Sequence, residues 1–199
     1  MSCEGCPSQG KCGKSSETCG IQSNPDNHIK NIITVMSGKG GVGKSTVTVM
    51  LAKAMAKKGL KVGIMDADIT GPSIPRLLAL SNEHAFGNEK QQLIPVESKE
   101  GIKVMSLNFL VQSESDPVIW RGPVIGGVVK QFYTDVVWGD LDVLLIDMPP
   151  GTGDVALTIM QSIPVQGVVM VSTPQPMVSM IVEKACHMCE KMEVKVLGI

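Results

Sequence analysis

The chain has no excess of charge of one sign. Its 199 residues include 18 Lys and Arg against 19 Asp and Glu, a formal net charge of -1 at pH 7. A protein that binds nucleic acid or an anionic membrane through bulk electrostatics carries a basic excess or a basic stripe, and this sequence shows neither. We therefore expect no nucleic-acid partner and no membrane partner.

Long apolar runs are also missing. Stretches such as residues 167–171 fall far short of the roughly 18 to 20 residues that span a bilayer. The polar N-terminus lacks the hydrophobic stretch of a secretory signal. These features predict a cytoplasmic protein, in whose reducing surroundings cysteines more often bind metals as thiolates than form disulfides.

The composition changes near residue 30. Residues 1–30 contain almost no apolar side chains and four of the six cysteines, so they are predicted to be a flexible cysteine-rich segment without a core. From residue 31, apolar runs alternate with helical patterns, which is typical of strands buried on both faces and joined by crossover helices. Residues 31–199 are therefore predicted to be one α/β domain, a mostly parallel sheet with helices on both faces.

The individual elements follow from these patterns. Strands are expected at residues 32–36, 62–66, 102–107, 143–147, 168–172 and 194–198. Helices are expected after the first strand and at residues 122–133, 154–162 and 177–192. The first helix should end at Gly59, and its apolar face is predicted from the spacing of Val47, Met50, Leu51, Ala54 and Met55. Residues 81–99 are polar and poorly periodic, and they are expected to form an irregular excursion.

A phosphate-loop motif stands between the first strand and the first helix. Residues 38–46 contain the pattern G-x-x-x-x-G-K-[ST], in which glycines let backbone N–H groups face phosphate oxygens. Lys44 would reach the β and γ phosphates of ATP, and the Ser45 hydroxyl would bind Mg²⁺. The expected nucleotide-binding residues are Gly38, Lys39, Gly40, Gly41, Val42, Gly43, Lys44, Ser45 and Thr46. Lys39 is a second lysine that such a loop does not need, and it is either a solvated surface residue or a phosphate contact across a dimer interface.

Carboxylates follow two of the predicted strands at the edge where such sheets bind ligands. Asp147 ends one apolar strand and is suited to holding Mg²⁺, and Asp66 ends another. We assign Asp66 to the metal and Asp68 to orienting the attacking water, so that Lys39, Lys44 and Asp68 are the expected catalytic residues. The alternative for these carboxylates is a structural role in which one of them caps a turn.

With these residues in place, the chain resembles the deviant-Walker P-loop ATPases, and within them the Mrp/Nbp-type (ApbC-like) iron-sulfur cluster carriers. Residues 39–45 are similar to a signature shared with division-site and DNA-partition ATPases and with nitrogenase iron proteins. Residues 66–73, 120–123 and 147–154 are similar to segments of the carriers.

The resemblance implies a SIMIBI-type P-loop fold, weak ATP hydrolysis and delivery of clusters to apoprotein clients. It also implies a homodimer in which Lys39 contacts nucleotide across the interface, and switch regions at residues 66–73 and 147–154. In the carriers, a cluster-binding Cys-x-x-Cys and a base-recognising Asn would follow the position of Ile199. The chain is therefore expected to be truncated at its C-terminus.

Four cysteines gather near the N-terminus. Cys3, Cys6, Cys12 and Cys19 supply enough thiolates for a [4Fe-4S] cluster or a tetrahedral zinc site. Their spacing does not decide between these two sites and a third alternative, in which the thiols bind no metal. The resemblance favours the cluster, because the Nbp-type branch carries an N-terminal Cys-x2-Cys-x5-Cys element; Cys19 as fourth ligand is our inference. The remaining two cysteines, Cys186 and Cys189, fall on the apolar face of a predicted helix and are expected to be core thiols.

These observations predict an ATP- and Mg²⁺-dependent carrier or scaffold for [4Fe-4S] clusters with weak ATPase activity. One alternative is a positioning ATPase of the division or partition type. The other is a non-hydrolysing adaptor that binds zinc.

Overall fold

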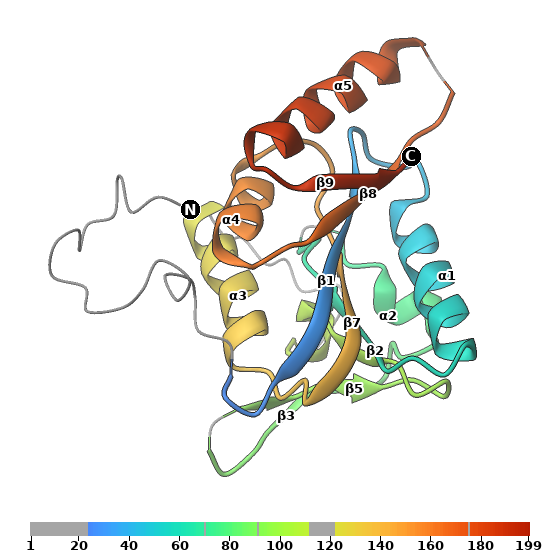
Figure 1. Cartoon of the computed structure of the whole chain (residues 1–199). Coiled ribbons are helices and arrows are strands. Elements are labelled where there is room, and N and C mark those ends of the chain that lie inside the picture. Colours follow the sequence, from blue (N-terminus) through green and yellow to red (C-terminus); the bar gives the residue numbers. More distant parts are fainter. Residues whose placement is uncertain (1–23, 70, 91, 112–121, 175) are drawn as a thin grey trace, which may run out of the picture.

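A seven-stranded sheet forms the centre of the computed structural model, which describes residues 24–69, 71–90, 92–111, 122–174 and 176–199 (Figure 1). The strand order is β5-β6-β2-β7-β1-β8-β9. All neighbouring strands run parallel except β5, which pairs antiparallel with β6. The strands are β1 (His28–Ser37), β2 (Val62–Asp66), β5 (Val96–Glu97), β6 (Lys103–Met105), β7 (Asp140–Asp147), β8 (Gly167–Val171) and β9 (Lys195–Gly198). The predicted α/β sheet is confirmed.

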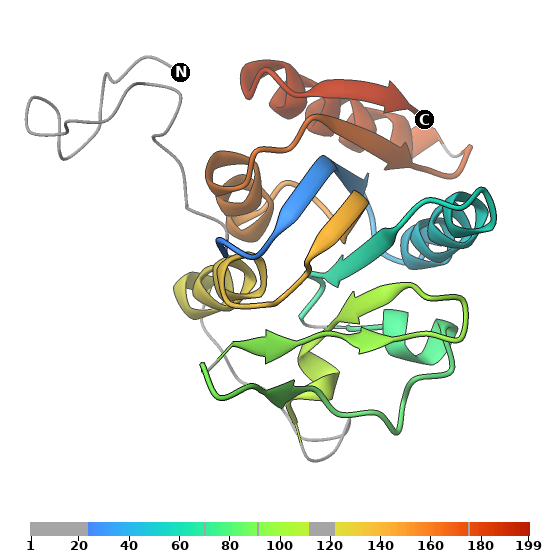
Figure 2. The ribbon, with the colours of Figure 1, turned by 60° about the horizontal axis from the view of Figure 1, so that its bottom comes forward.

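Helices cover both faces of this sheet. In Figure 2 the strands follow one another from β9 (red) to β5 (green), with α1 (cyan) on one side and α3 (yellow) and α4 (orange-brown) on the other. The longer helices are α1 (Lys44–Lys57), α3 (Gly122–Thr134), α4 (Asp154–Ser162) and α5 (Pro176–Lys191), and α2 (Ile74–Leu77) is a single turn beside α1. Within the described residues, no helix combines the length and the apolar character that a bilayer crossing needs.

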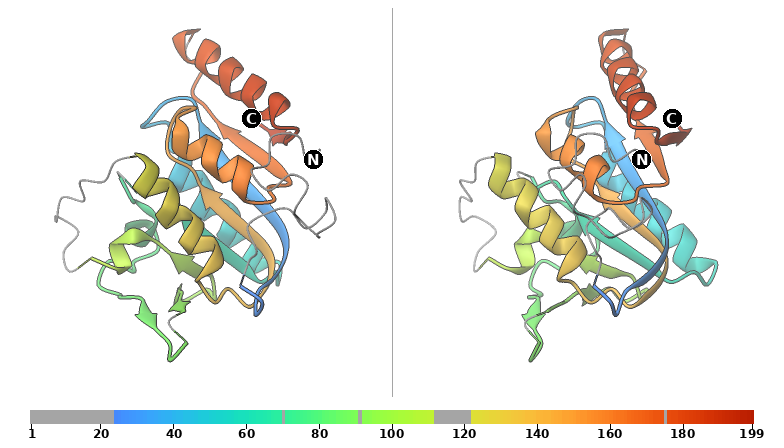
Figure 3. Two further views of the ribbon diagram at one scale, coloured as in Figure 1. Left: turned by 90° about the vertical axis from the view of Figure 1, so that its left-hand side faces the viewer. Right: turned by 60° about the vertical axis from the view of Figure 1, so that its left-hand side comes forward.

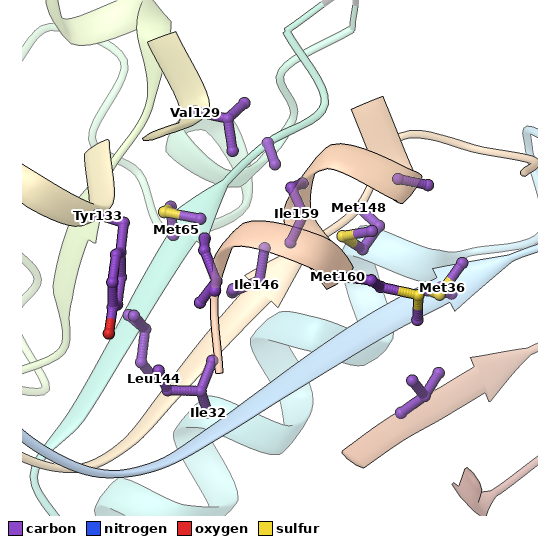
Figure 4. Close-up of a cluster of buried hydrophobic side chains, with 14 of the residues drawn as sticks. Ile32, Met36, Met65, Val129, Tyr133, Leu144, Ile146, Met148, Ile159 and Met160 are labelled. Atoms are coloured by element: carbon purple, nitrogen blue, oxygen red, sulfur yellow. The ribbon is translucent and has the colours of Figure 1, made fainter. Parts of the chain in front are cut away.

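Two apolar cores hold the layers together. On one face, side chains of the central strands pack against α3, α4 and α5. Figure 4 shows part of this cluster, with Ile146 of β7 near Ile159 of α4 and Leu144 of β7 near Ile32 of β1. On the other face, residues of β2, β6 and β7 pack against α1 and α2. Because the central strands contribute to both cores, their sequences are apolar along their length rather than alternating.

Two sequence expectations about secondary structure are wrong. The stretch 81–99 is not irregular throughout, since it contains β3 (Phe86–Gly87), β4 (Leu93–Ile94) and β5. Its strands are two residues long, too short for their apolar periodicity to be visible in the sequence. The predicted strand 102–107 is shorter, because a 3-10 helix begins at Leu107.

The apolar face of α1 is also different from the predicted one. Met50, assigned to that face, is 65% exposed, and the fully buried residues include Thr48, Val49 and Ala52. Leu51 and Met55 of the predicted face do pack against the core. The predicted face is therefore correct in part, since Met50 and Ala54 are exposed.

Candidate nucleotide site

The loop between β1 and α1 borders a cavity at the carboxyl edge of the sheet. Gly41 and Gly43 have φ angles of 77° and 88°, a left-handed conformation that side-chain-bearing residues adopt only at a cost. Gly43 directly precedes α1, so the loop presents the helix N-terminus to the cavity. The cavity has a volume of about 470 Å³ and is lined by Ser37, Gly40, Gly41, Gly43, Lys44, Ser45, Thr46, Asp68, Gly71, Ser73, Arg76, Leu77 and Pro150.

Lys44 and Ser45 converge on one carboxylate. The Lys44 ammonium lies 2.7 Å from Oδ2 of Asp147 and 3.6 Å from Oδ2 of Asp68. The Ser45 hydroxyl donates to the same Oδ2 of Asp147 at 2.6 Å. Asp147 is fully buried at the end of β7, so these donors compensate a carboxylate that has no access to water.

Thr48 is a further member of the site that sequence reasoning missed. Its hydroxyl donates to Oδ1 of Asp147 at 2.7 Å and also lies 3.1 Å from the backbone oxygen of Lys44. The side chain is fully buried although it is polar. Its place one helical turn after the loop lysine is the signal that could have pointed to it.

Asp66 and Asp68 have different surroundings. Asp66 pairs in register with Asp147 across neighbouring strands and is fully buried. Burial raises the pKa of Asp66 to about 8, and the nearby charge of Asp147 contributes to that rise. The Ser106 hydroxyl and the Asp68 backbone N–H donate to Asp66 at 3.1 and 3.2 Å. Asp68 lines the cavity and Asp66 is not among the lining residues. Their assignment to water and metal stays a prediction.

The residues present fit Mg²⁺. Ser45 lines the cavity, and its hydroxyl is hydrogen-bonded to the buried Asp147 carboxylate. Two hard oxygen donors, the type of ligand that Mg²⁺ prefers, therefore stand together. Asp66 and Asp147 are register partners on neighbouring strands, and a bound cation would offset the negative charge that they bring to the site.

Two further residues of the phosphate loop, Gly38 and Lys39, are not among those that line the cavity. Lys39 is exposed and is not among the residues that line the cavity, so its role across a dimer interface stays a prediction. Gly38 touches α5, because a Cβ at this position would lie 2.8 Å from Cγ2 of Ile181. Trp120 and Arg121, part of the carrier-like segment, lie outside the described residues.

The six cysteines fall into two groups. Cys3, Cys6, Cys12 and Cys19 lie outside the described residues, so the cluster site is still a prediction. In α5, Cys189 is fully buried and the neighbouring Cys186 is partly buried against the core. Burial raises the pKa of the Cys189 thiol to about 11, which keeps it protonated and a poor metal ligand.

The expected core role of the α5 pair is thereby confirmed. No group of three or more His, Cys, Asp or Glu residues suited to a metal ion occurs in the described part of the chain.

A phosphate loop between a central strand and a helix, with carboxylates at the ends of the adjacent strands, defines a P-loop nucleotide-binding protein. Residues 28–199 match the family model ParA, which is described as NUBPL iron-transfer P-loop NTPase. The chain therefore belongs to this family.

Relatives at high identity share the family. The iron-sulfur cluster carrier protein of Clostridium perfringens is 50% identical over 211 residues, a match that covers all of this chain and 74% of that protein. The iron-sulfur cluster transfer protein NUBPL of Dictyostelium discoideum is 49% identical over 172 residues, covering 86% of this chain and 53% of that protein. The chain thus spans between about half and three quarters of these two relatives.

Solved structures agree with the fold. A nucleotide-binding protein from Archaeoglobus fulgidus in complex with ADP superposes with a TM-score of 0.75 at 49% identity, covering 86% of this chain and 65% of that one. The septum site-determining protein MinD of Pyrococcus horikoshii, with Mg-ADP, gives 0.59 at 21% identity, covering 85% and 68%. The MinD likeness shows the fold alone. The resemblance to the deviant-Walker ATPases and their iron-sulfur branch is confirmed.

Proposed function

We propose that this protein is an ATP-dependent carrier of [4Fe-4S] clusters. The observation that carries the proposal is the convergence of Lys44, Ser45 and Thr48 on Asp147 beside the phosphate loop, in a chain that belongs to an iron-transfer NTPase family. The names of its relatives, iron-sulfur cluster carrier and transfer proteins, support the choice of cargo. The proposal is favoured over a positioning ATPase and over a zinc adaptor.

The nucleotide would bind with its phosphates against the loop. Residues 38–46 would supply backbone N–H groups, and Lys44 would exchange its contact with Asp147 for the β and γ phosphates. Ser45, Asp147 and Asp66 would hold Mg²⁺, which neutralises phosphate charge when bound. Asp68, at the cavity wall, would orient the attacking water for slow hydrolysis.

Hydrolysis would act on the rest of the molecule through two segments at the cavity. Asp68, Gly71 and Ser73 of one segment and Pro150 of the other line the cavity wall. The backbone N–H of Gly151 donates to the Ser37 oxygen at 2.8 Å, which ties the second segment to the end of β1. Loss of the γ phosphate would therefore shift segments 66–73 and 147–154 together.

The protein would act as a homodimer in the cytoplasm. A homodimer would let the exposed Lys39 of one subunit neutralise phosphate charge in the other, as an arginine finger does. Cys3, Cys6, Cys12 and Cys19 would hold the cluster in the segment that precedes the ATPase domain. The predicted domain start at residue 31 is a few residues late, because β1 begins at His28. The protein would work in the cytoplasm and pass clusters to apoprotein clients.

Anaerobic reconstitution with iron and sulfide tests the cargo. The expected product is a brown protein with broad visible absorption, about four iron and four sulfide per cluster, and slow ATP hydrolysis. A colourless protein that retains stoichiometric zinc under the same conditions would contradict the carrier function and favour the adaptor.

A further inference from the structure

The hairpin formed by β3 and β4 carries an exposed apolar pair. Phe86 and Ile94 are direct cross-strand partners, so their side chains stand on the same face. Phe86 is 72% exposed and Ile94 is 43% exposed. The Asn88 side chain accepts backbone N–H bonds from Lys90 and Gln92 at 3.0 and 2.9 Å, which shapes the turn. The pair is therefore presented on a structured projection, visible at the bottom of both views in Figure 3.

This hairpin is anchored beside the first described residues of the chain. Leu93 donates its backbone N–H to Asp135 and accepts from Val137, both at 2.9 Å. Asn27 is fixed to the same segment, 135–139, through two side-chain hydrogen bonds of 2.9 Å. The hairpin and the point where the cysteine-rich segment joins the domain thus share one anchor, at the edge of the sheet where β1 and β7 begin (Figure 1).

The length of the chain restricts where a cluster can sit. Cys19 precedes Asn24 by five residues, so it stays within about 17 Å of Asn24 whatever its conformation. The phosphate loop lies at the far end of β1, a strand of 10 residues and so about 33 Å long. A cluster bound through Cys19 would therefore lie nearer to the Asn24 end of β1, which shares its anchor with the hairpin, than to the phosphate loop of its own subunit.

A protein that accepts this cluster must come to the same edge. In each exchange, an iron bond to a carrier cysteine breaks, a bond to a client cysteine forms, and the proton of the client thiol passes to the departing thiolate. Iron and sulfide keep their oxidation states, and the exchange requires client sulfur within bonding distance of iron. The client surface beside its acceptor thiols therefore faces the hairpin.

The cysteine-rich segment itself is a poor cover for the apolar pair. Its only large apolar side chains, within residues 1–23, are Met1 and Ile21. The edge beside the hairpin also holds charged groups, such as Lys30 and Asp142, but these pair with each other at 2.7 Å. We propose that Phe86 and Ile94 form the docking surface for the apoprotein client, which presents an apolar patch next to its acceptor cysteines. This inference rests on the proposed carrier function.

A double variant tests the surface. Phe86→Ser combined with Ile94→Thr should leave the fold and ATP hydrolysis unchanged, because both side chains are exposed and distant from the phosphate loop. The matched control is Met50→Gln, which removes an exposed apolar side chain from α1. Apo-aconitase serves as the client probe, and its binding to the full chain is measured without cluster by fluorescence anisotropy. Cluster transfer is then followed by the recovery of aconitase activity.

The double variant should weaken binding of apo-aconitase and slow cluster transfer to it at least about tenfold, while Met50→Gln behaves as the parent. Loss of cluster to a small iron chelator, which needs no docking, should be equal in all three proteins. Equal binding and transfer in parent and double variant would overturn the docking surface. The docking surface would also be overturned if the parent were a dimer and the double variant a monomer, because Phe86 and Ile94 would then form a contact between two copies of this chain. If the parent took up no cluster but still bound apo-aconitase more tightly than the double variant, the docking surface would be supported and the carrier function refuted.

Discussion

The ammonium nitrogen of Lys44 lies 2.7 Å from Oδ2 of Asp147, and the two residues are 6% and 0% exposed. One belongs to the phosphate loop and the other to the end of β7, 103 positions later. The contact joins Lys44, which would bind the phosphates, to the end of β7, from which the proposed switch segment 147–154 begins. Bound phosphate and Asp147 would compete for the same ammonium group, which would link phosphate binding to the proposed movement of the 147–154 segment.

Replacing Lys44 removes the centre of this arrangement. Lys44→Ala should lower the affinity for ATP at least about 100-fold, since the cation facing the phosphates is lost. Titration calorimetry measures the affinity, and a thermal melt verifies that the variant is folded. Lys53→Ala, on the exposed side of the same helix, is the control and should bind ATP as the parent does. Parental affinity in Lys44→Ala would show that the phosphate-loop assignment is wrong.

Thr48→Val tests the hydrogen bond that sequence reasoning missed. The two side chains have nearly the same shape, but valine leaves one oxygen of the buried Asp147 without its hydroxyl donor. The free energy of unfolding should fall by about 1–3 kcal/mol, measured in urea. The exposed neighbour Thr46, changed to Val, should alter it by less than about 0.5 kcal/mol. An equally small effect at Thr48 would mean that its hydroxyl does not stabilise Asp147.

Asp142 should contribute to the pH dependence of stability. The Lys30 ammonium, followed by the Lys61 backbone N–H, lowers the pKa of this carboxyl. A lowered pKa in the folded state stabilises the protein above the unfolded value of about 3.9, and that contribution is lost as the pH falls through the folded value. Asp142→Asn should therefore melt at a lower temperature than the parent at pH 7, with the difference closing below about pH 4. Glu89→Gln, in the hairpin turn, is the control and should melt like the parent at pH 7.

The two groups of cysteines should respond oppositely to substitution. Changing Cys3, Cys6, Cys12 and Cys19 to Ser should abolish the visible absorption of the reconstituted protein, because serine replaces all four proposed ligands. Changing Cys186 and Cys189 to Ser should preserve the absorption and lower the melting temperature, since a hydroxyl replaces the buried Cys189 thiol. The reverse pattern would overturn both assignments.

Gly63 of β2 packs closely against leucine side chains of β7. A Cβ at this position would lie 2.7 Å from Cδ1 of Leu141 and 3.0 Å from Cδ1 of Leu144. Gly63→Ala should therefore destabilise the protein by about 1–3 kcal/mol in urea unfolding. Gly127→Ala, in α3 where a Cβ meets nothing within 4 Å, should stabilise it by up to about 1 kcal/mol. A stabilising Gly63→Ala would show that the strands around it can separate to admit the methyl group.

Local patterns explain which features could be predicted. The phosphate loop is contiguous, so its glycines, Lys44 and Ser45 are recognisable without knowing the fold. Buried parallel strands are apolar along their length, which located β2 and β7 and so the carboxylates at their ends. In contrast, Met50 is exposed although its spacing assigns it to the apolar face of α1, because spacing alone does not tell which neighbouring positions the sheet covers.

The sequence by itself determined the fold class, the phosphate loop and the pairing of strand ends with carboxylates, because each follows from the chemistry of adjacent residues. Only the tertiary structure decided that Thr48 supports Asp147, that Asp66 is buried beside Ser106, and that the Phe86 hairpin stands where the cysteine-rich segment enters. These contacts join residues about 40 to more than 100 positions apart. They depend on strand order and register, which no local pattern specifies.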